Sequence, residues 1–286
     1  MKKSDYGNYQ YSSLKNCINW KTKAHGYGGH GVIFCFKSWD AYDKIFCKER
    51  YNNPRYVLEE KMKVIIDSSM ADLGITDVVY AVVTGLDPKA ELPDDIKERI
   101  RAMGEAVTAG AFDAVYDNEV TEGYRELIKR AGRSVKKNPP TVPGFIDNIK
   151  HRGSMPHINS IVDIYNMESL RSSLAIGGHD LDSVHGDIIV TVSGREDTFT
   201  AIGGSEKRVA PTDFVYRDEN GILAWLDVRD SEFYKMSDDT ANVLFVMQGN
   251  AATSVEYRLE AMKRLEEDLK RVHPGMEFDV KVASIE

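Results

Sequence analysis

The stretch that decides the fold runs from Met155 to Leu170 and reads MPHINSIVDIYNMESL, and it is followed by IGGHDLD at residues 176–182. The first segment has apolar residues at helical spacing. It predicts a helix whose buried face is formed by Ile158, Ile161, Val162 and Tyr165. The second segment is short and polar, so it predicts a turn or a close approach of backbone rather than a core element.

Three polar side chains, Asn159, Asp163 and Asn166, fall near one another on the predicted helix at i, i+3 and i, i+4 spacing. Polar groups beside a core require hydrogen-bond partners. One interpretation is that these side chains cap the helix and tie down adjacent backbone. The other is that they line a binding site.

The Gly177-Gly178 pair also has two interpretations. Glycines permit unusual φ values and close backbone approach, so their N–H groups could bind a carbonyl or ribose oxygen. A plain tight turn explains the same letters. The polar residues that follow, His179, Asp180, Asp182 and His185, are of metal-ligating types, but their spacing matches no defined metal motif. We therefore predict no metal and no cofactor.

Five short motifs occur in a fixed order, at residues 155–170, 176–182, 186–188, 202–204 and 239–243. Together they resemble the B3/B4 domain, the tRNA-editing module of the phenylalanyl-tRNA synthetase β subunit, in a freestanding form. The resemblance is close over residues 145–250 and looser from Met62 to the C-terminus. Each motif is weak alone, and their order and spacing carry the resemblance.

The resemblance implies an α+β fold in which a β-sandwich of unusual topology is flanked by helices. It implies hydrolysis in trans of a mischarged aminoacyl-tRNA, with the aminoacylated 3′ end of the tRNA as partner and with neither DNA nor a membrane involved. A separate hydrolytic pocket multiplies the limited selectivity of a synthesis pocket. The alternative is a non-catalytic tRNA-binding or amino-acid-binding domain. The oligomeric state stays open.

An aminoacyl ester is already activated, so such a site has only to position water and stabilise the developing oxyanion. The resemblance implies catalytic roles for Gly177, Gly178, His179 and Thr240, and substrate contacts by Asn159, Asn166, Asp180, Trp225 and Asn242. Two positions depart from the family pattern. A histidine slot holds Gly177, and an acidic slot holds Val246.

One cationic run interrupts an otherwise acidic region, and we expect it to contact RNA phosphates. It comprises Lys129, Arg130, Arg133, Lys136, Lys137, Lys150 and Arg152. The alternative is an ordinary solvated helix end. Residues 62–286 carry a net charge of −13, which argues against broad affinity for nucleic acid.

Composition divides the chain near Met62. Residues 1–61 carry a net charge of +5 and hold all three cysteines, whereas the whole 286-residue chain carries −8. We interpret 1–61 as an atypical extension, with Met62 as a hypothetical translation start, and 62–286 as the B3/B4-type domain. The Gly26–Gly31 stretch precedes a strand-like run, the wrong order for a phosphate loop. The cysteines match no disulfide or zinc pattern and no segment is apolar enough to span a membrane, so we expect a cytoplasmic protein.

The remaining pattern predicts alternating elements. Helices are expected at 96–107, from 119 to about 131, around 145–149 and at 253–272. Strands are expected at 64–66, 78–83, 188–192, 198–202, 214–216, 222–228, 243–247 and, at an edge, 278–282. The Asn220-Gly221 step predicts a hairpin.

Overall fold

The structure is a computed structural model, and it describes residues 62–285. The predicted N-terminal extension and its glycine-rich stretch lie outside the described residues.

Two sheets and a separate hairpin make up the strand side of the molecule. The four-stranded sheet has the order β11-β2-β10-β3, and the five-stranded sheet has the order β1-β4-β7-β8-β9. The first comprises β2 (Asp77–Thr84), β3 (Gly177–Asp180), β10 (Val243–Met247) and β11 (Glu277–Ser284). The second comprises β1 (Val64–Ile66), β4 (Ile188–Val192), β7 (Phe214–Arg217), β8 (Ile222–Trp225) and β9 (Arg229–Asp230). The hairpin pairs β5 (Asp197–Ala201) with β6 (Ser205–Val209).

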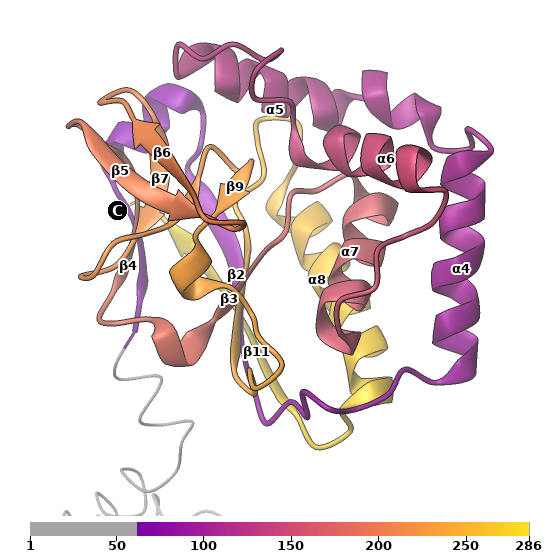
Figure 1. The fold of residues 1–286 in the computed structure, drawn as a ribbon. Coiled ribbons are helices and arrows are strands. Elements are labelled where there is room, and N and C mark those ends of the chain that lie inside the picture. Colours follow the sequence, from indigo (N-terminus) through magenta and orange to yellow (C-terminus); the bar gives the residue numbers. More distant parts are fainter. Residues whose placement is uncertain (1–61, 286) are drawn as a thin grey trace, which may run out of the picture. The chain divides into compact units, whose positions relative to one another are not determined.

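Five α-helices complete the described chain: α4 (Asp94–Thr108), α5 (Glu119–Arg130), α6 (Thr141–Arg152), α7 (Ser160–Ser172) and α8 (Val255–Val272). Four short 3-10 helices connect them, η1 (Ser68–Leu73), η2 (Asp113–Asp117), η3 (Leu181–Ser183) and η4 (Glu232–Tyr234). Figure 1 shows the sheets on one side and α4, α7 and α8 on the other, with α5 and α6 across the top. This arrangement confirms the α+β prediction.

The main core lies between the four-stranded sheet and the helices α7 and α8. Burial explains the sequence of β2, whose run DVVYAVVT has apolar side chains on both faces. Phe245 of β10 and Ile164 of α7 are fully buried in this core, as is Leu265 of α8. Ser254 caps α8 by accepting a hydrogen bond from the Tyr257 N–H.

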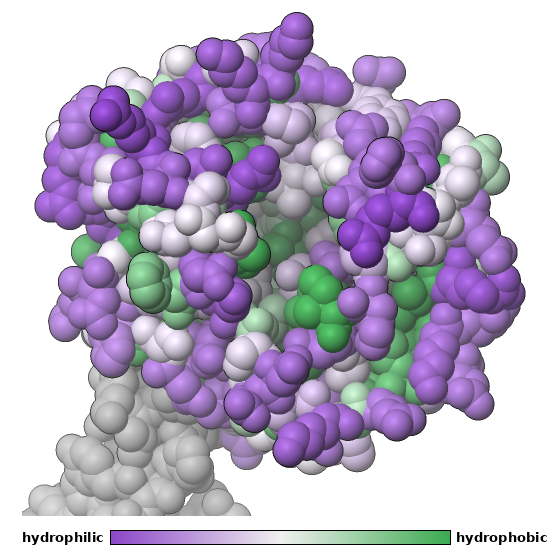
Figure 2. Space-filling model, viewed as in Figure 1, coloured by the Kyte–Doolittle hydropathy of each residue, from purple (hydrophilic) through white to green (hydrophobic). Residues whose placement is uncertain are grey.

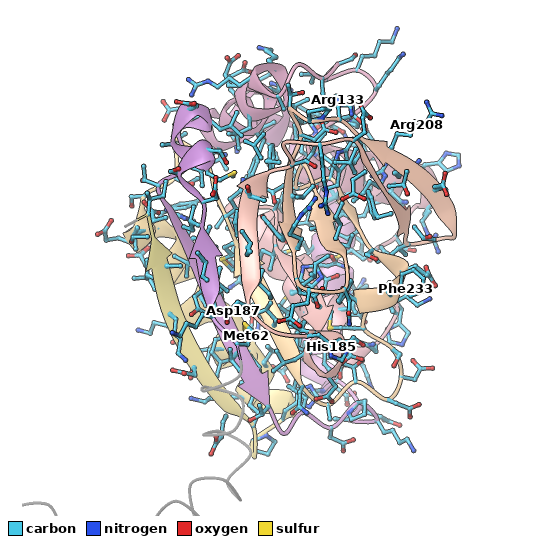
Figure 3. All side chains as sticks on the ribbon, turned by 90° about the vertical axis from the view of Figure 1, so that its left-hand side faces the viewer. Met62, Arg133, His185, Asp187, Arg208 and Phe233 are labelled. Carbon is cyan, nitrogen blue, oxygen red and sulfur yellow. The ribbon has the colours of Figure 1, made fainter. Side chains whose placement is uncertain are left out.

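Pairing within the five-stranded sheet fixes its first strand. β1 and β4 are parallel, and the Lys63 N–H donates to the Asp187 carboxylate at 2.8 Å just before both strands begin. Figure 3 shows Met62 and Asp187 close together at this point. The predicted edge strand is confirmed, because β11 pairs only with β2 in the sheet order.

Three expectations were wrong in ways that bear on the site. Ile158 lies before α7 and is 59% exposed, so it is not part of the buried helix face. The Gly177-Gly178 pair forms β3 with no positive φ, so it is not a turn. The predicted strand 222–228 ends at Trp225, because Leu226 and Asp227 adopt φ of 57° and 52°.

Candidate functional site

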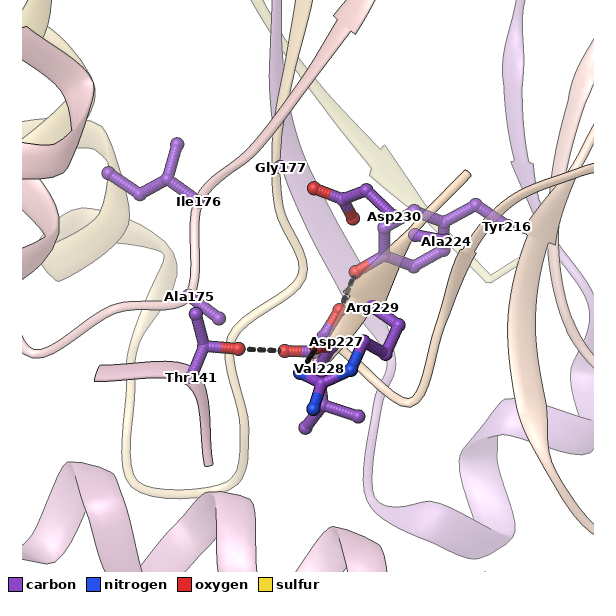
Figure 4. Close-up of a pocket in the computed structure, with 10 residues that line it drawn as sticks. All are labelled: Thr141, Ala175, Ile176, Gly177, Tyr216, Ala224, Asp227, Val228, Arg229 and Asp230. Carbon is purple, nitrogen blue, oxygen red and sulfur yellow. Dashed lines mark hydrogen bonds between the residues drawn. The ribbon is translucent and has the colours of Figure 1, made fainter. Parts of the chain in front are cut away.

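A pocket opens where the strand side meets the helices. It holds about 340 Å³ of space free of protein atoms, part of it open to solvent. The part of this space that a water-sized sphere can enter is about 60 Å³, which is well below the volume of a typical small-molecule site. Its wall comprises Thr141, Ala175, Ile176, Gly177, Tyr216, Ala224, Asp227, Val228, Arg229 and Asp230 (Figure 4). In Figure 2 the molecular surface is hollowed between the strand side and the helical side.

The turn between β8 and β9 places Asp227 in the pocket. Left-handed backbone is unfavourable for a bulky residue such as Leu226, so the neighbouring structure must hold the turn in place. The Val228 N–H donates to the Trp225 carbonyl at 3.1 Å, and the Thr141 hydroxyl at the start of α6 donates to the Asp227 carbonyl. The start of α6 and the strands β8 and β9 therefore fix the position of Asp227.

The Asp227 carboxylate accepts hydrogen bonds from neutral groups. The Tyr216 hydroxyl donates to Oδ1, and the Gln248 amide donates to Oδ2 at 3.0 Å. Burial raises the pKa of Asp227 to about 7; the Tyr216 hydrogen bond lowers it and the nearby charge of Asp230 raises it. Such a carboxyl exchanges a proton near neutral pH, which is what a general base requires.

Asp230 lies in the same wall, at the end of β9. Burial raises its pKa to about 7 as well, and the charge of Arg229 opposes the shift. Its backbone carbonyl accepts from the Ile202 N–H at 2.9 Å, but its carboxylate has no hydrogen-bond partner among the described residues. The two carboxyls were missed by the sequence analysis.

The two glycines of the Gly177-Gly178 pair lie in different surroundings. Gly177 lines the pocket, whereas Gly178 is buried, and a Cβ there would lie 2.7 Å from Cε of Met236 and 3.3 Å from the Tyr165 ring. Across the β3–β10 ladder Gly177 pairs with the buried Val246. The two positions that depart from the family pattern are thus cross-strand neighbours, and of the two only Gly177 lines the pocket.

His179 lies one layer behind this wall. It is fully buried, and neither ring nitrogen has a hydrogen-bond partner. Its Nε2 points toward Gly177, since a Cβ built on Gly177 would lie 3.0 Å from that atom. Burial lowers the pKa of His179 to about 4, so the ring is neutral at pH 7.

Replacing His179 by leucine is expected to raise the free energy of unfolding by about 1–3 kcal/mol, because it removes buried polar atoms that have no partner. The increase in the free energy of unfolding should be larger at pH 5 than at pH 8. The unfolded chain takes up the histidine proton below about pH 6.5 and the folded chain only near pH 4, so stability falls as the pH drops through that window. Urea titrations at both pH values measure the effect.

His273→Leu is the matched control. His273 is also buried, but its Nδ1 accepts from the Asp87 N–H at 3.2 Å and its Nε2 lies 3.4 Å from Ser160 Oγ. This substitution should destabilise the protein. Equal destabilisation by the two variants would contradict the assignment of His179 as unpartnered.

The Ser160–His273 contact does not form a nucleophilic pair. Because the Asp87 N–H donates to Nδ1 of the neutral ring, Nε2 carries the proton and cannot accept one from Ser160.

Thr240 and Asn242 lie at the other end of β3, outside the pocket lining. The Thr240 hydroxyl donates to the Asp180 carboxylate at 3.1 Å, and the Asn242 amide donates to Asp182 at 3.1 Å. These contacts hold the loop before β10 against β3. The structure therefore does not bring Thr240, Asp180 or Asn242 together with Gly177 around one cavity.

The other predicted contact residues are also away from the lining. Asn159 caps α7 by accepting from the Val162 N–H at 2.9 Å, which confirms the capping interpretation. Asn166 is half-buried on α7. Trp225 is buried, and its indole N–H donates to Asp213 at 2.8 Å. No group of metal-ligating side chains converges within residues 62–285.

The predicted RNA-contacting cations are mostly engaged in the fold. Lys129 pairs with Glu126 at 2.5 Å, and Lys150 pairs with Asp113 at 2.5 Å. The Arg130 guanidinium donates to the Leu73 carbonyl at 3.2 Å.

Arg133 is held most firmly of the predicted cations. Its guanidinium makes two hydrogen bonds, at 2.6 and 2.5 Å, to the fully buried Asp213 and lies over the Trp225 ring. Lys136, Lys137 and Arg152 are exposed and have no side-chain partner among the described residues. Of the predicted set, these three are therefore free to meet a phosphate.

No helix in residues 62–285 combines the length and the apolar composition that a bilayer crossing needs.

Comparison with known proteins places the pocket inside a recognised sequence family. The model of the B3/4 domain family matches residues 123–284, which include every residue of the pocket wall. The chain is 27% identical over 112 residues to the phenylalanine–tRNA ligase beta subunit of Mycoplasma pneumoniae, covering 39% of this chain and 13% of that protein. It is 25% identical over 162 residues to that of Leifsonia xyli, covering 57% and 19%. The chain thus spans less than a fifth of the length of these relatives.

A solved structure also resembles the chain. It is an N-terminal fragment of the phenylalanyl-tRNA synthetase beta subunit from Pyrococcus horikoshii, with a TM-score of 0.40 and 14% identity, covering 78% of this chain and 51% of that one.

Proposed function

Since this chain belongs to the B3/4 domain family, we propose that it hydrolyses the ester bond of a mischarged aminoacyl-tRNA in trans, in the pocket between Gly177 and Asp227. The observation that supports this proposal best is a carboxyl with a pKa near 7 in the wall of a pocket that opens to solvent. The ester is already activated, so a positioned water and one base suffice for its hydrolysis.

Asp227 is the proposed base. Each carboxylate oxygen can accept two hydrogen bonds, so the bonds from Tyr216 and Gln248 leave capacity for a water. In the reaction the Asp227 carboxylate takes a proton from that water, and the hydroxide forms a bond to the ester carbon. The bond between that carbon and the ribose oxygen then breaks, and the ribose oxygen leaves with the proton that Asp227 returns. Gly177 lets the substrate carbonyl approach the backbone, because no side chain stands there.

The alternative is an amino-acid-binding domain without turnover. Val246 and Gly177 favour it, because these paired positions hold an acidic group and a histidine in the family pattern and neither here. The two proposals separate in one experiment. A panel of mischarged tRNAs is incubated with the full chain, and ester loss is followed against buffer. We expect accelerated loss for at least one amino acid, and loss at the buffer rate on the whole panel would refute hydrolysis.

We propose that tRNA contacts Lys136, Lys137 and Arg152. Reversing all three to glutamate should weaken tRNA binding at least tenfold and reduce the slope of log affinity against log salt by about one for each lost phosphate contact. Filter binding at several salt concentrations measures both. The matched control reverses three exposed lysines on other parts of the domain, Lys89, Lys97 and Lys263. Equal loss of tRNA binding in both triple variants would contradict the proposal that tRNA contacts Lys136, Lys137 and Arg152.

A further inference from the structure

Apart from Arg229, the polar side chains of the pocket wall offer hydrogen-bond acceptors and no uncommitted donors. The hydroxyls of Thr141 and Tyr216 both donate to Asp227. Arg229, the cation of the wall, is exposed and turns Nη1 onto the Val228 carbonyl at 2.7 Å. A carboxylate is acceptor-only when ionised, so Asp227 and Asp230 add acceptors and no donors to the wall.

Asp230 is the uncommitted acceptor in this wall. Its carboxylate is half-buried and has no hydrogen-bond or ion-pair partner among residues 62–285, although the pocket leaves it reachable. A carboxylate removed from water without a partner is costly unless a ligand or a proton satisfies it. Its position in Figure 4, beside Tyr216 and facing the hollow, suits a ligand group entering from solvent.

A second observation points the same way. His179 is fully buried without a partner for either nitrogen, and its Nε2 points at Gly177 in the pocket wall. At neutral pH one of its ring nitrogens is an acceptor. The unpartnered ring behind Gly177 and the unpartnered carboxylate of Asp230 in the same wall are both acceptors without donors.

We propose that this pocket recognises an ammonium group, with Asp230 as its anchor. An ammonium carries three N–H donors and a positive charge, which match an acceptor-rich and acidic lining. The inference rests on the proposed function and specifies its substrate class. The pocket takes aminoacyl groups whose amine is free, and it excludes those whose amine is blocked. The ammonium can come from the α-amine or from a basic side chain.

Calorimetric titration of the full chain with amino-acid amides tests this proposal. The probes are alaninamide, tyrosinamide and lysinamide, each with and without an Nα-acetyl group. Acetylation of alaninamide and tyrosinamide should weaken binding at least tenfold. Retained binding of Nα-acetyl-lysinamide would assign the side-chain amine as the source of the charge. Equal binding of free and acetylated alaninamide and tyrosinamide, or no binding of any probe, would overturn the proposal.

Two variants that each remove one negative charge complete the experiment. Asp230→Asn should weaken binding of the free amides at least tenfold, whereas Asp238→Asn, at an exposed carboxylate outside the pocket lining, should leave it unchanged. A folded Asp230→Asn protein that binds as tightly as the parent would also overturn the proposal. Amide binding without deacylation of any tRNA would refute the proposed function alone. Equal rates of deacylation for aminoacyl-tRNA with and without an Nα-acetyl group would refute this inference alone.

Discussion

Replacing Arg133 by methionine is expected to lower the free energy of unfolding by about 3 kcal/mol. The substitution keeps the apolar stem but leaves the fully buried Asp213 carboxylate without its cation. Breaking a buried pair on one side typically costs 3–5 kcal/mol, and the low end applies because the Arg133 side chain is 30% exposed. Urea denaturation measures the loss.

A double-mutant cycle isolates the charge pair from packing. In an Asp213→Asn background, Arg133→Met should cost much less, because the neutral amide needs no cation. Trp225 bonds to Asp213 and directly precedes the turn that holds Asp227, so the pair also supports the pocket. An unchanged stability of Arg133→Met would show that Arg133 is a solvated cation, available to RNA as the sequence suggested.

Replacing Asp227 by asparagine is expected to reduce the rate of ester hydrolysis by about 10²–10⁴-fold, the usual contribution of a general base. In the parent protein the rate should rise with pH and level off above about pH 7, where the carboxyl is ionised. The variant should lose this dependence. Single-turnover deacylation between pH 5.5 and 8.5 measures both, with Asp238→Asn as the control for charge.

Asp227→Asn should raise the stability of the protein at high pH, although it lowers the activity. The pKa of Asp227 is raised in the folded protein, so its contribution to stability is fully present below the unfolded value of about 3.8 and is lost as the pH rises through about 7. Asparagine stays neutral, and the variant should therefore melt higher than the parent at pH 8 and similarly at pH 4. A variant that is inactive because it is unfolded would show a lower melting temperature at both pH values.

Much of the fold follows from local patterns in the sequence. The run Val243–Met247 is a strand as predicted, and the Asn220-Gly221 step joins β7 to β8. The apolar residues of α8 recur at helical spacing, so they form one face of the helix, and this face packs in the core. By contrast, β6 reads SEKRV and β3 reads GGHD, and neither has the alternating apolar residues that announce a strand. Each is a strand through its pairing with a neighbour, β6 with β5 and β3 with β10.

The site was less predictable than the fold. The motif at residues 176–182 contains Gly177, which lines the pocket, but the carboxyls in the same wall come from the turn after β8 and from β9. That turn looked like the middle of a strand, because Leu226 and Val228 are apolar and only their backbone conformation breaks the run. A perturbed pKa depends on burial and on neighbours distant in sequence, which no local pattern reports.

The most direct test of the account is where an amide-linked, non-hydrolysable aminoacyl-adenosine binds, determined in a crystal structure of the complex. The amino acid is the one that the deacylation panel selects. The account predicts its carbonyl between Gly177 and the Asp227 carboxylate. Binding at the Thr240 end of β3, or anywhere that leaves this pocket empty, would contradict it.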